Sequence, residues 1–144
     1  MRALHSLSTE RIVSIASDTM RLCAIARLHL STAEPSSTDF NVKVLTKICW
    51  RIFWSAYAFD RAVETMFDLA FPIPDCQVTV KMHANMDDAE LERRCQFAFP
   101  DDPQSQPSLS SVSAALDAVY CRQIQSEILN TILHRGYAAH FDPF

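Results

Sequence analysis

A long stretch without proline or glycine, residues 41–70, constrains the fold of this chain most. Apolar residues recur through it every three or four positions, as on one face of an α-helix. These residues are Leu45, Ile48, Ile52, Ala56, Phe59, Val63, Met66 and Ala70. A second strip adds Cys49, Phe53 and Tyr57, flanked by Trp50 and Trp54. A helix with so wide an apolar surface belongs in the middle of a packing arrangement, so we predict a long central helix.

Two further helical blocks are expected. The first covers about residues 8–30 and begins at Ser8 or Thr9, which can cap a helix. The last covers about residues 110–134 and is followed by Gly136, the one glycine of the 144 residues. Its apolar residues repeat every four positions: Val112, Leu116, Tyr120, Ile124, Ile128 and Ile132. A chain so poor in glycine is expected to be all-α, because hairpins and phosphate-binding loops depend on that residue.

Proline-rich segments separate these blocks. Pro72 and Pro74 end the central helix and favour an extended link over residues 71–80. Residues 31–39 are expected to form a loop, and residues 86–96 a short helix that starts at Asp87 or Asp88. Residues 100–108 are polar and rich in proline, and they are predicted to form a mobile loop. We interpret residues 1–144 as one incomplete domain.

Composition excludes several functions. The net charge is −4, so direct DNA binding is not expected of this chain. The basic stripe Lys43, Lys47 and Arg51 is interpreted as a solvated face or as partners for acidic residues. No apolar run reaches the length of a membrane span, and the N-terminus does not resemble a signal peptide. The sequence therefore predicts a soluble intracellular protein that does not act at a membrane.

The residues that usually carry chemistry are scattered. The five cysteines are odd in number, lie far apart and include no C-x-x-C pair, so they are interpreted as small buried apolar residues. No histidines have the spacing of a metal site, and no serine lies in a G-x-S-x-G motif. We therefore expect no catalytic residue, no metal ligand and no cofactor in this chain, and no enzyme activity.

One motif is specific enough to suggest a family. Residues 51–61 read R-I-F-W-S-A-Y-A-F-D-R. They resemble the R-x-F-W-x-x-Y-x-x-D-R signature of the fungal-specific transcription factor domain, the middle homology region of fungal zinc-cluster regulators. The residues that match this signature and the link after it are Arg51, Phe53, Trp54, Tyr57, Asp60, Arg61, Pro72, Ile73 and Asp75. Residues 21–29 and 116–133 resemble flanking helices of that domain, in the same order.

The chain departs from the family pattern at several places. Ala26 and Arg27 stand where the family favours leucine and glycine, and the glycine and arginine that precede Pro72 are missing. The family's DNA-binding module holds zinc with six closely spaced cysteines, and the cysteines of this chain cannot form that cluster. The family domain is also usually longer than this chain. The resemblance therefore implies a truncated or partial regulatory domain without its own zinc-cluster module.

The family resemblance implies a function in transcription. Such a domain does no chemistry and regulates the DNA-binding and activation segments attached to it, in the nucleus. Protein partners or self-association are expected, and a small-molecule effector is a further expectation. Two alternatives remain open: a stand-alone helical interaction module that competes for dimerisation, and a small helical ligand carrier or enzyme.

The roles of the motif residues are also left open. Trp50, Trp54 and Tyr57 could be core residues, or they could line an effector pocket or an interface. Asp60 and Arg61 are expected to form structural salt bridges, for example between Arg61 and Glu64. Because an incomplete helical domain leaves apolar stripes uncovered on its second and third helical blocks, we predict that the chain aggregates or self-associates.

Overall fold

A computed structural model describes residues 2–97 and 110–138 of the chain. Its regular elements are all helical: α1 Arg2–Ile25, η1 Ser31–Ala33, α2 Phe40–Phe67, η2 Asp75–Gln77, α3 Asp88–Phe97 and α4 Ser113–Ala138. The predicted all-α class is confirmed for the described residues, and so is the long central helix. The loop predicted at residues 100–108 lies outside the described residues.

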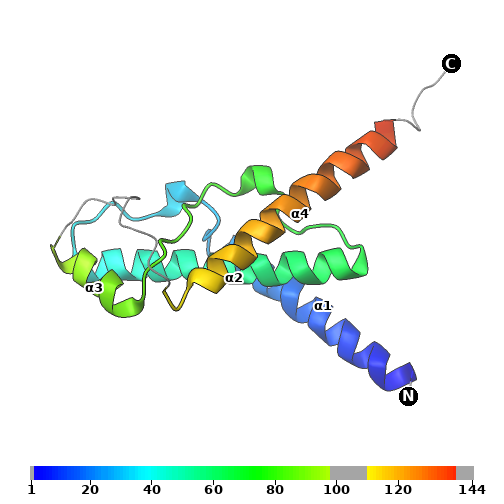
Figure 1. The fold of residues 1–144 in the computed structure, drawn as a ribbon, viewed down its shortest axis with the longest axis horizontal. Coiled ribbons are helices and arrows are strands. Elements are labelled where there is room, and N and C mark those ends of the chain that lie inside the picture. Colours follow the sequence, from blue (N-terminus) through cyan, green and yellow to red (C-terminus); the bar gives the residue numbers. More distant parts are fainter. Residues whose placement is uncertain (1, 98–109, 139–144) are drawn as a thin grey trace.

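Helix α2 is the centre of the arrangement. Helices α1, α3 and α4 each pack against it (Figure 1). Helix α3 lies along the N-terminal part of α2, whereas α1 and α4 diverge from it, so the two chain ends point away from each other (Figure 1). The link between α2 and α3 returns along α2 through η2 and brings the segment near residue 75 beside α4.

The ends of α2 are set by two aspartates. The carboxylate of Asp39 accepts hydrogen bonds from the backbone N–H groups of Asn41 and Val42, as an N-cap does. At the other end Asp68 adopts a left-handed conformation with φ 54°, and its N–H bonds to the carbonyl of Glu64. The helix therefore ends at Phe67, a little before the predicted residue 70 and before Pro72 is reached.

Helix α1 differs from the prediction at both ends. It begins at Arg2 rather than near Ser8, and it ends at Ile25 rather than near residue 30. The cause of the early end is Arg27, whose φ is 57°, while the N–H of Leu28 bonds to the carbonyl of Cys23. A left-handed residue followed by such a bond is a common helix terminator. The loop predicted at residues 31–39 is found, with the short turn η1 inside it.

The two later helices also refine the prediction. Helix α3 begins at Asp88 as expected, and Asp87 caps it by accepting a hydrogen bond from the N–H of Glu90. Helix α4 continues to Ala138, so Gly136 lies within the helix and does not terminate it. The predicted C-terminal role of Gly136 was wrong. The extended link at residues 71–80 is interrupted by the helical turn η2.

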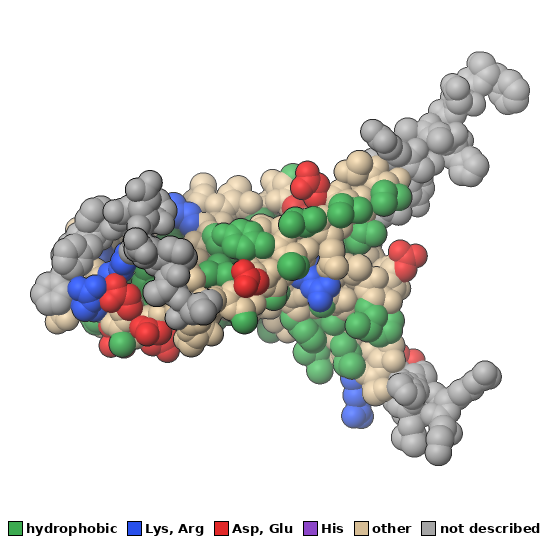
Figure 2. Space-filling model, in the orientation of Figure 1, with side chains coloured by type: hydrophobic (Ala, Val, Ile, Leu, Met, Phe, Trp, Pro, Cys, Tyr) green, Lys and Arg blue, Asp and Glu red, His purple; other side chains and the backbone are tan. Residues whose placement is uncertain are grey.

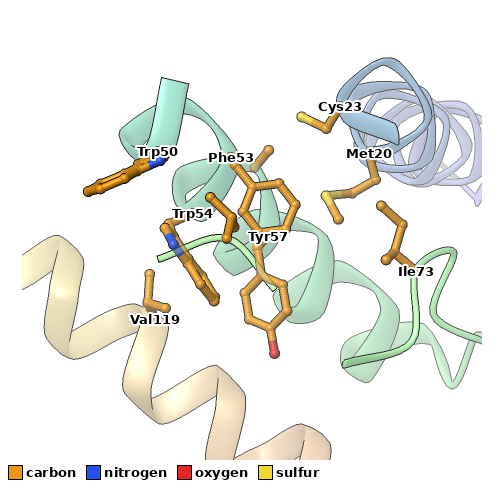
Figure 3. Packing of buried hydrophobic residues seen from close by; sticks show 10 residues of the cluster. Met20, Cys23, Trp50, Phe53, Trp54, Tyr57, Ile73 and Val119 are labelled. Atoms are coloured by element: carbon orange, nitrogen blue, oxygen red, sulfur yellow. The ribbon is translucent and has the colours of Figure 1, made fainter. Parts of the chain in front are cut away.

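The hydrophobic core lies on the aromatic strip of α2. Phe53, Trp54 and Tyr57 are buried and stack edge to face or tilted, with ring centroids 5.2–6.3 Å apart. The cluster also contains residues of α1, of the link, of α4 and two more of α2, and most of it is labelled in Figure 3: Met20 and Cys23, Ile73 and Val80, Val119, and Trp50 and Ala56. The core thus joins three helices and the link through one side of α2.

The longer stripe that the sequence suggested as the inner face of α2 is mostly on the outside. Ala56 and Val63 are buried, but five other members are exposed: Leu45, Ile48, Ile52, Phe59 and Met66. The interpretation of the cysteines was also wrong in part, because Cys23 is buried whereas Cys76 and Cys121 are exposed. Aromatic rings bury more surface than aliphatic side chains, which is the physical reason for the aromatic strip to face the core.

Candidate functional site

Arg61 lies at the centre of the motif residues. Its guanidinium is 1% exposed and bonds to the Asp60 carboxylate at 2.9 Å, to the Asp75 carboxylate at 2.7 Å and to the carbonyl of Ile73 at 2.5 Å. The ring of Tyr57 lies 4.5 Å from the guanidinium carbon, a cation–π distance. The predicted structural role of Asp60 and Arg61 fits this geometry, but the carboxylates that bond to Arg61 are Asp60 and Asp75 rather than Glu64.

Asp75 connects this centre to α4. One of its carboxylate oxygens accepts hydrogen bonds from the Tyr57 hydroxyl, at 3.0 Å, and from Arg61. The other oxygen accepts a bond from the hydroxyl of Ser126 on α4. Burial alone would raise the pKa of Asp75, but the hydrogen bonds from Ser126 and Arg61 lower it below its ordinary value. The network formed by Asp60, Arg61, Asp75, Tyr57 and Ser126 therefore fastens α2, the link and α4 together.

Two buried carboxylates carry unusual proton affinities. Asp60 and Glu64 are 0% and 2% exposed. Burial raises the pKa of Asp60 to about 6, against the opposing effect of the Arg61 charge. Burial and the neighbouring charge of Asp60 raise the pKa of Glu64 to about 7. One Glu64 oxygen has no hydrogen-bond partner in the described structure. The carboxylates of Asp60, Glu64 and Asp75 therefore outnumber the guanidinium of Arg61.

The remaining motif residues are spread along the same helix and link. Phe53 is fully buried in the core, and Ile73 is 4% exposed beside it. Arg51 forms an ion pair with Asp88 and bonds to the carbonyl of Met86, so it docks the start of α3 on α2. Pro72 is exposed and has no described contact in this network. The motif residues therefore stabilise two separate contacts, one around Arg61 and one between Arg51 and α3, and do not form one site.

An open cleft of about 420 Å³ lies against the network. Its lining residues come from α2, from the link and from α4: Trp54, Tyr57, Asp75, Val78, Gln123, Glu127, Asn130 and Thr131. Burial and the Asp75 carboxylate raise the pKa of Tyr57 to about 12, so its hydroxyl remains protonated and keeps donating to Asp75. Trp54 and Tyr57 are therefore both core residues and cleft-lining residues, which joins the two roles left open by the sequence.

Trp50 faces a different, smaller space. It lines a pocket of about 110 Å³ together with residues of the segment 26–35. Its indole N–H donates to the Glu34 carboxylate at 3.0 Å, and the Lys47 ammonium lies 4.1 Å from its ring. The indole N–H of Trp54 donates instead to the carbonyl of Lys81 at 2.8 Å. The three aromatic residues predicted as one group are thus divided between two sites.

Sequence reasoning missed the α4 side of the cleft. Ser126, Gln123 and Asn130 lie three or four residues apart, which puts them on one helical face. That polar spacing is visible in the sequence, but the apolar period of four on the same helix is the stronger pattern. Glu64 is expected from its spacing to pair with Arg61, and the sequence does not indicate that this carboxylate is buried.

In residues 2–97 and 110–138, no group of three or more His, Cys, Asp and Glu side chains is arranged to hold a metal ion. Over the same ranges, no helix is long and apolar enough to cross a membrane. The network and the cleft beside it remain as the candidate functional site.

Comparison of the chain with family models, with curated protein sequences and with solved structures gave no match.

Proposed function

We propose that this chain is a helical regulatory domain of the type found in fungal zinc-cluster transcription factors. The observation that carries the proposal is the position of the signature residues. Tyr57, Asp60 and Arg61 from the signature meet Asp75 from the following link in one network, in which Asp75 is only partly buried. The signature residues hold α2 and the link together, so their type and spacing are explained by a structural role. A structural role is what a regulatory domain without catalytic activity would require of them.

A second observation supports the proposal. Arg27 occupies the position at which the family pattern has glycine, and its φ is 57°. Glycine adopts this left-handed conformation without steric cost, whereas other residues do so at a cost. The backbone at residue 27 therefore has the conformation for which a glycine would be selected.

Under this proposal the chain acts in the nucleus and controls a DNA-binding module that it does not itself contain. We do not expect enzyme activity, because the Asp75 carboxylate at the cleft already accepts bonds from Arg61, Tyr57 and Ser126. No zinc ion has a role in this part of the regulator. Any zinc would belong to the separate DNA-binding module that the family resemblance implies.

A tethered reporter assay tests the proposal. The chain is inserted between a heterologous zinc-cluster DNA-binding domain and an activation domain in yeast. We expect reporter output to change several-fold relative to a fusion that carries an unrelated helical domain of similar size. Arg61→Leu should abolish the change at equal protein level, whereas Arg21→Leu, in an exposed pair with Asp18, should keep it. Equal output from the chain and from the unrelated domain would refute a regulatory role.

The second candidate function is a stand-alone interaction module, and a specific observation favours it. Four apolar residues of α4 are more than half exposed: Tyr120, Ile124, Ile128 and Ile132. Hydrophobic side chains gather along α4, and others cover the diverging α1 (Figure 2). A surface of this kind suits a partner helix. The two functions are compatible, since a regulatory domain can act through dimerisation.

A further inference from the structure

After Val119, which is part of the core, helix α4 presents its polar side to the body of the protein. A helix that packs on a core usually turns its apolar face inward. From Tyr120 onward, the apolar stripe of α4 faces solvent. On the other side of the helix, Gln123, Ser126 and Asn130 face α2. Ser126 is accounted for by its bond to Asp75. Gln123 and Asn130 have no such bond, so their inward position requires another explanation.

These polar side chains form one wall of the 420 Å³ cleft, a size typical of small-molecule sites. The wall consists of Gln123, Glu127, Asn130 and Thr131. The opposite wall is made by Trp54, Tyr57 and Val78. Figure 3 shows Trp54 and Tyr57 pointing from α2 toward α4. Two amides and a carboxylate therefore face a largely aromatic surface across an open space.

The polar wall has unused hydrogen-bonding capacity. In the described part of the chain, no hydrogen bond or ion pair engages the side chains of Gln123, Glu127 or Asn130. Thr131 uses its hydroxyl to bond to the backbone carbonyl of Glu127. An amide that faces a cleft without a protein partner is available to a ligand.

The charge around the cleft selects the kind of ligand. Asp75 remains ionised because its pKa lies below the ordinary value, and Glu127 adds an exposed carboxylate at the rim. Arg61 is the cation nearest to these groups in the network, and it is already paired with Asp60 and Asp75. Because Asp75 and Arg61 are paired with each other, Glu127 is the charge that a ligand in the cleft would meet, and a carboxylate attracts a cation and repels an anion.

We propose that this cleft binds a small organic cation, a protonated amine carried on a flat apolar body. The ammonium group lies against the Glu127 carboxylate and the amide oxygens of Gln123 and Asn130. The apolar body lies against Trp54, Tyr57 and Val78. The role of this cation as an effector rests on the proposed regulatory function. Its binding to the purified chain does not require a role in transcription.

Nuclear magnetic resonance can test the site directly, because the chain has only two tryptophans. Trp54 lines the cleft and Trp50 lines the other pocket, so their indole N–H signals report on separate places. The probe is tryptamine, and its control is N-acetyltryptamine, which keeps the ring and lacks the charge. We expect tryptamine to shift the Trp54 signal in a saturable way and to leave the Trp50 signal in place. N-acetyltryptamine should bind about tenfold more weakly, as expected for loss of one charge-assisted contact.

A matched pair of variants locates the charge. Glu127→Gln should weaken tryptamine binding about tenfold, because it removes the carboxylate and keeps the shape. Asp117→Asn removes another exposed carboxylate of α4, away from the cleft, and should leave the dissociation constant unchanged. The proposal is overturned if tryptamine causes no saturable shift at Trp54, if the neutral analogue binds equally well, or if Glu127→Gln has no effect. Any of these results would leave the reporter assay above unaffected, and failure of that assay would leave binding measurable.

Discussion

At the scale of single residues, Arg61 has more consequence than any other charged side chain described. It is buried between two carboxylates and a backbone carbonyl that belong to different segments. Replacing it with leucine would leave Asp60 and Asp75 as buried or half-buried charges without their cation. We expect Arg61→Leu to lower the free energy of unfolding by about 3–5 kcal/mol, as the breaking of other buried ion pairs does.

Urea unfolding followed by tryptophan fluorescence would measure this loss. The control is Arg21→Leu, because the pair between Arg21 and Asp18 is long, 3.7 Å, and exposed on both sides. That variant should unfold close to the wild-type midpoint. Arg61→Lys should fall in between, since lysine keeps the charge and loses the fork that reaches several acceptors. Equal midpoints for Arg61→Leu and Arg21→Leu would show that the network does not hold the fold.

Glu64 makes stability depend on pH in an unusual direction. Burial raises its folded-state pKa to about 7 from an ordinary value of 4.5. The folded state therefore binds a proton more tightly than the unfolded state, and its stability falls as the pH rises from about 4.5 to about 7. The slope from one such proton is at most about 1.4 kcal/mol per pH unit. We expect Glu64→Gln to flatten urea-unfolding free energies measured across this window.

Two other groups affect the same window and can be separated. Asp60, with a pKa raised to about 6 by burial, contributes in the same direction but only up to about that pH. His83 contributes in the opposite direction, because burial lowers its pKa and stability is lost as the pH falls. The difference between wild type and Glu64→Gln above pH 6 therefore reports mainly on Glu64. Parallel curves for the two proteins there would contradict the assignment.

At the scale of elements, the end of α1 is the clearest strained position. Arg27 has φ 57°, a conformation that glycine adopts more easily than other residues do. We expect Arg27→Gly to raise the free energy of unfolding by roughly 0.5–1 kcal/mol, after the greater freedom of glycine in the unfolded chain is subtracted. Arg27→Ala is the control, because it removes the same side chain and keeps the steric conflict. A melting temperature that rises for glycine and not for alanine would confirm the backbone origin.

The helices could largely be predicted from the sequence, but the face that each helix buries could not. Residues 41–70 contain a helical period without proline or glycine, which is a local property of the sequence, and α2 follows it closely. The same helix offers an aliphatic stripe through Ile52 and an aromatic strip through Phe53. Which of them is buried depends on what the other helices present, and that is not local. The aromatic strip is buried, and the stripe with Ile52, which is 50% exposed, is not.

The candidate site shows the same limit. The spacing of Tyr57, Asp60 and Arg61 was recognised as a motif, and Asp75 was associated with it. Ser126 lies more than fifty residues further along the chain, and only the packing of α4 brings its hydroxyl to Asp75. The cleft depends on the same packing, so the polar spacing on α4 indicates a polar helix face but not the cleft that this face lines.

At the scale of the whole molecule, exposed apolar surface is the dominant feature. The exposed stripe of α4, defined by Tyr120, Ile124, Ile128 and Ile132, runs along a helix that diverges from the body (Figure 2). The diverging α1 adds Leu22 and Ile25, which are 65% and 73% exposed. Contiguous patches of this kind are rarely left uncovered in soluble monomers. We expect a second copy of the chain to cover the stripe, helix against helix.

Sedimentation velocity over a concentration series would test this expectation. The wild-type chain should sediment as a dimer or larger species, and the double variant Ile124→Lys, Ile128→Lys as a monomer. Because burying one isoleucine contributes about 1.5–3 kcal/mol, the dissociation constant should rise at least about a hundredfold. The control variant Ala118→Lys, Gln125→Lys adds the same charge at exposed α4 positions outside the stripe and should remain associated. A wild-type chain that stays monomeric at every concentration would instead favour a different partner for this helix.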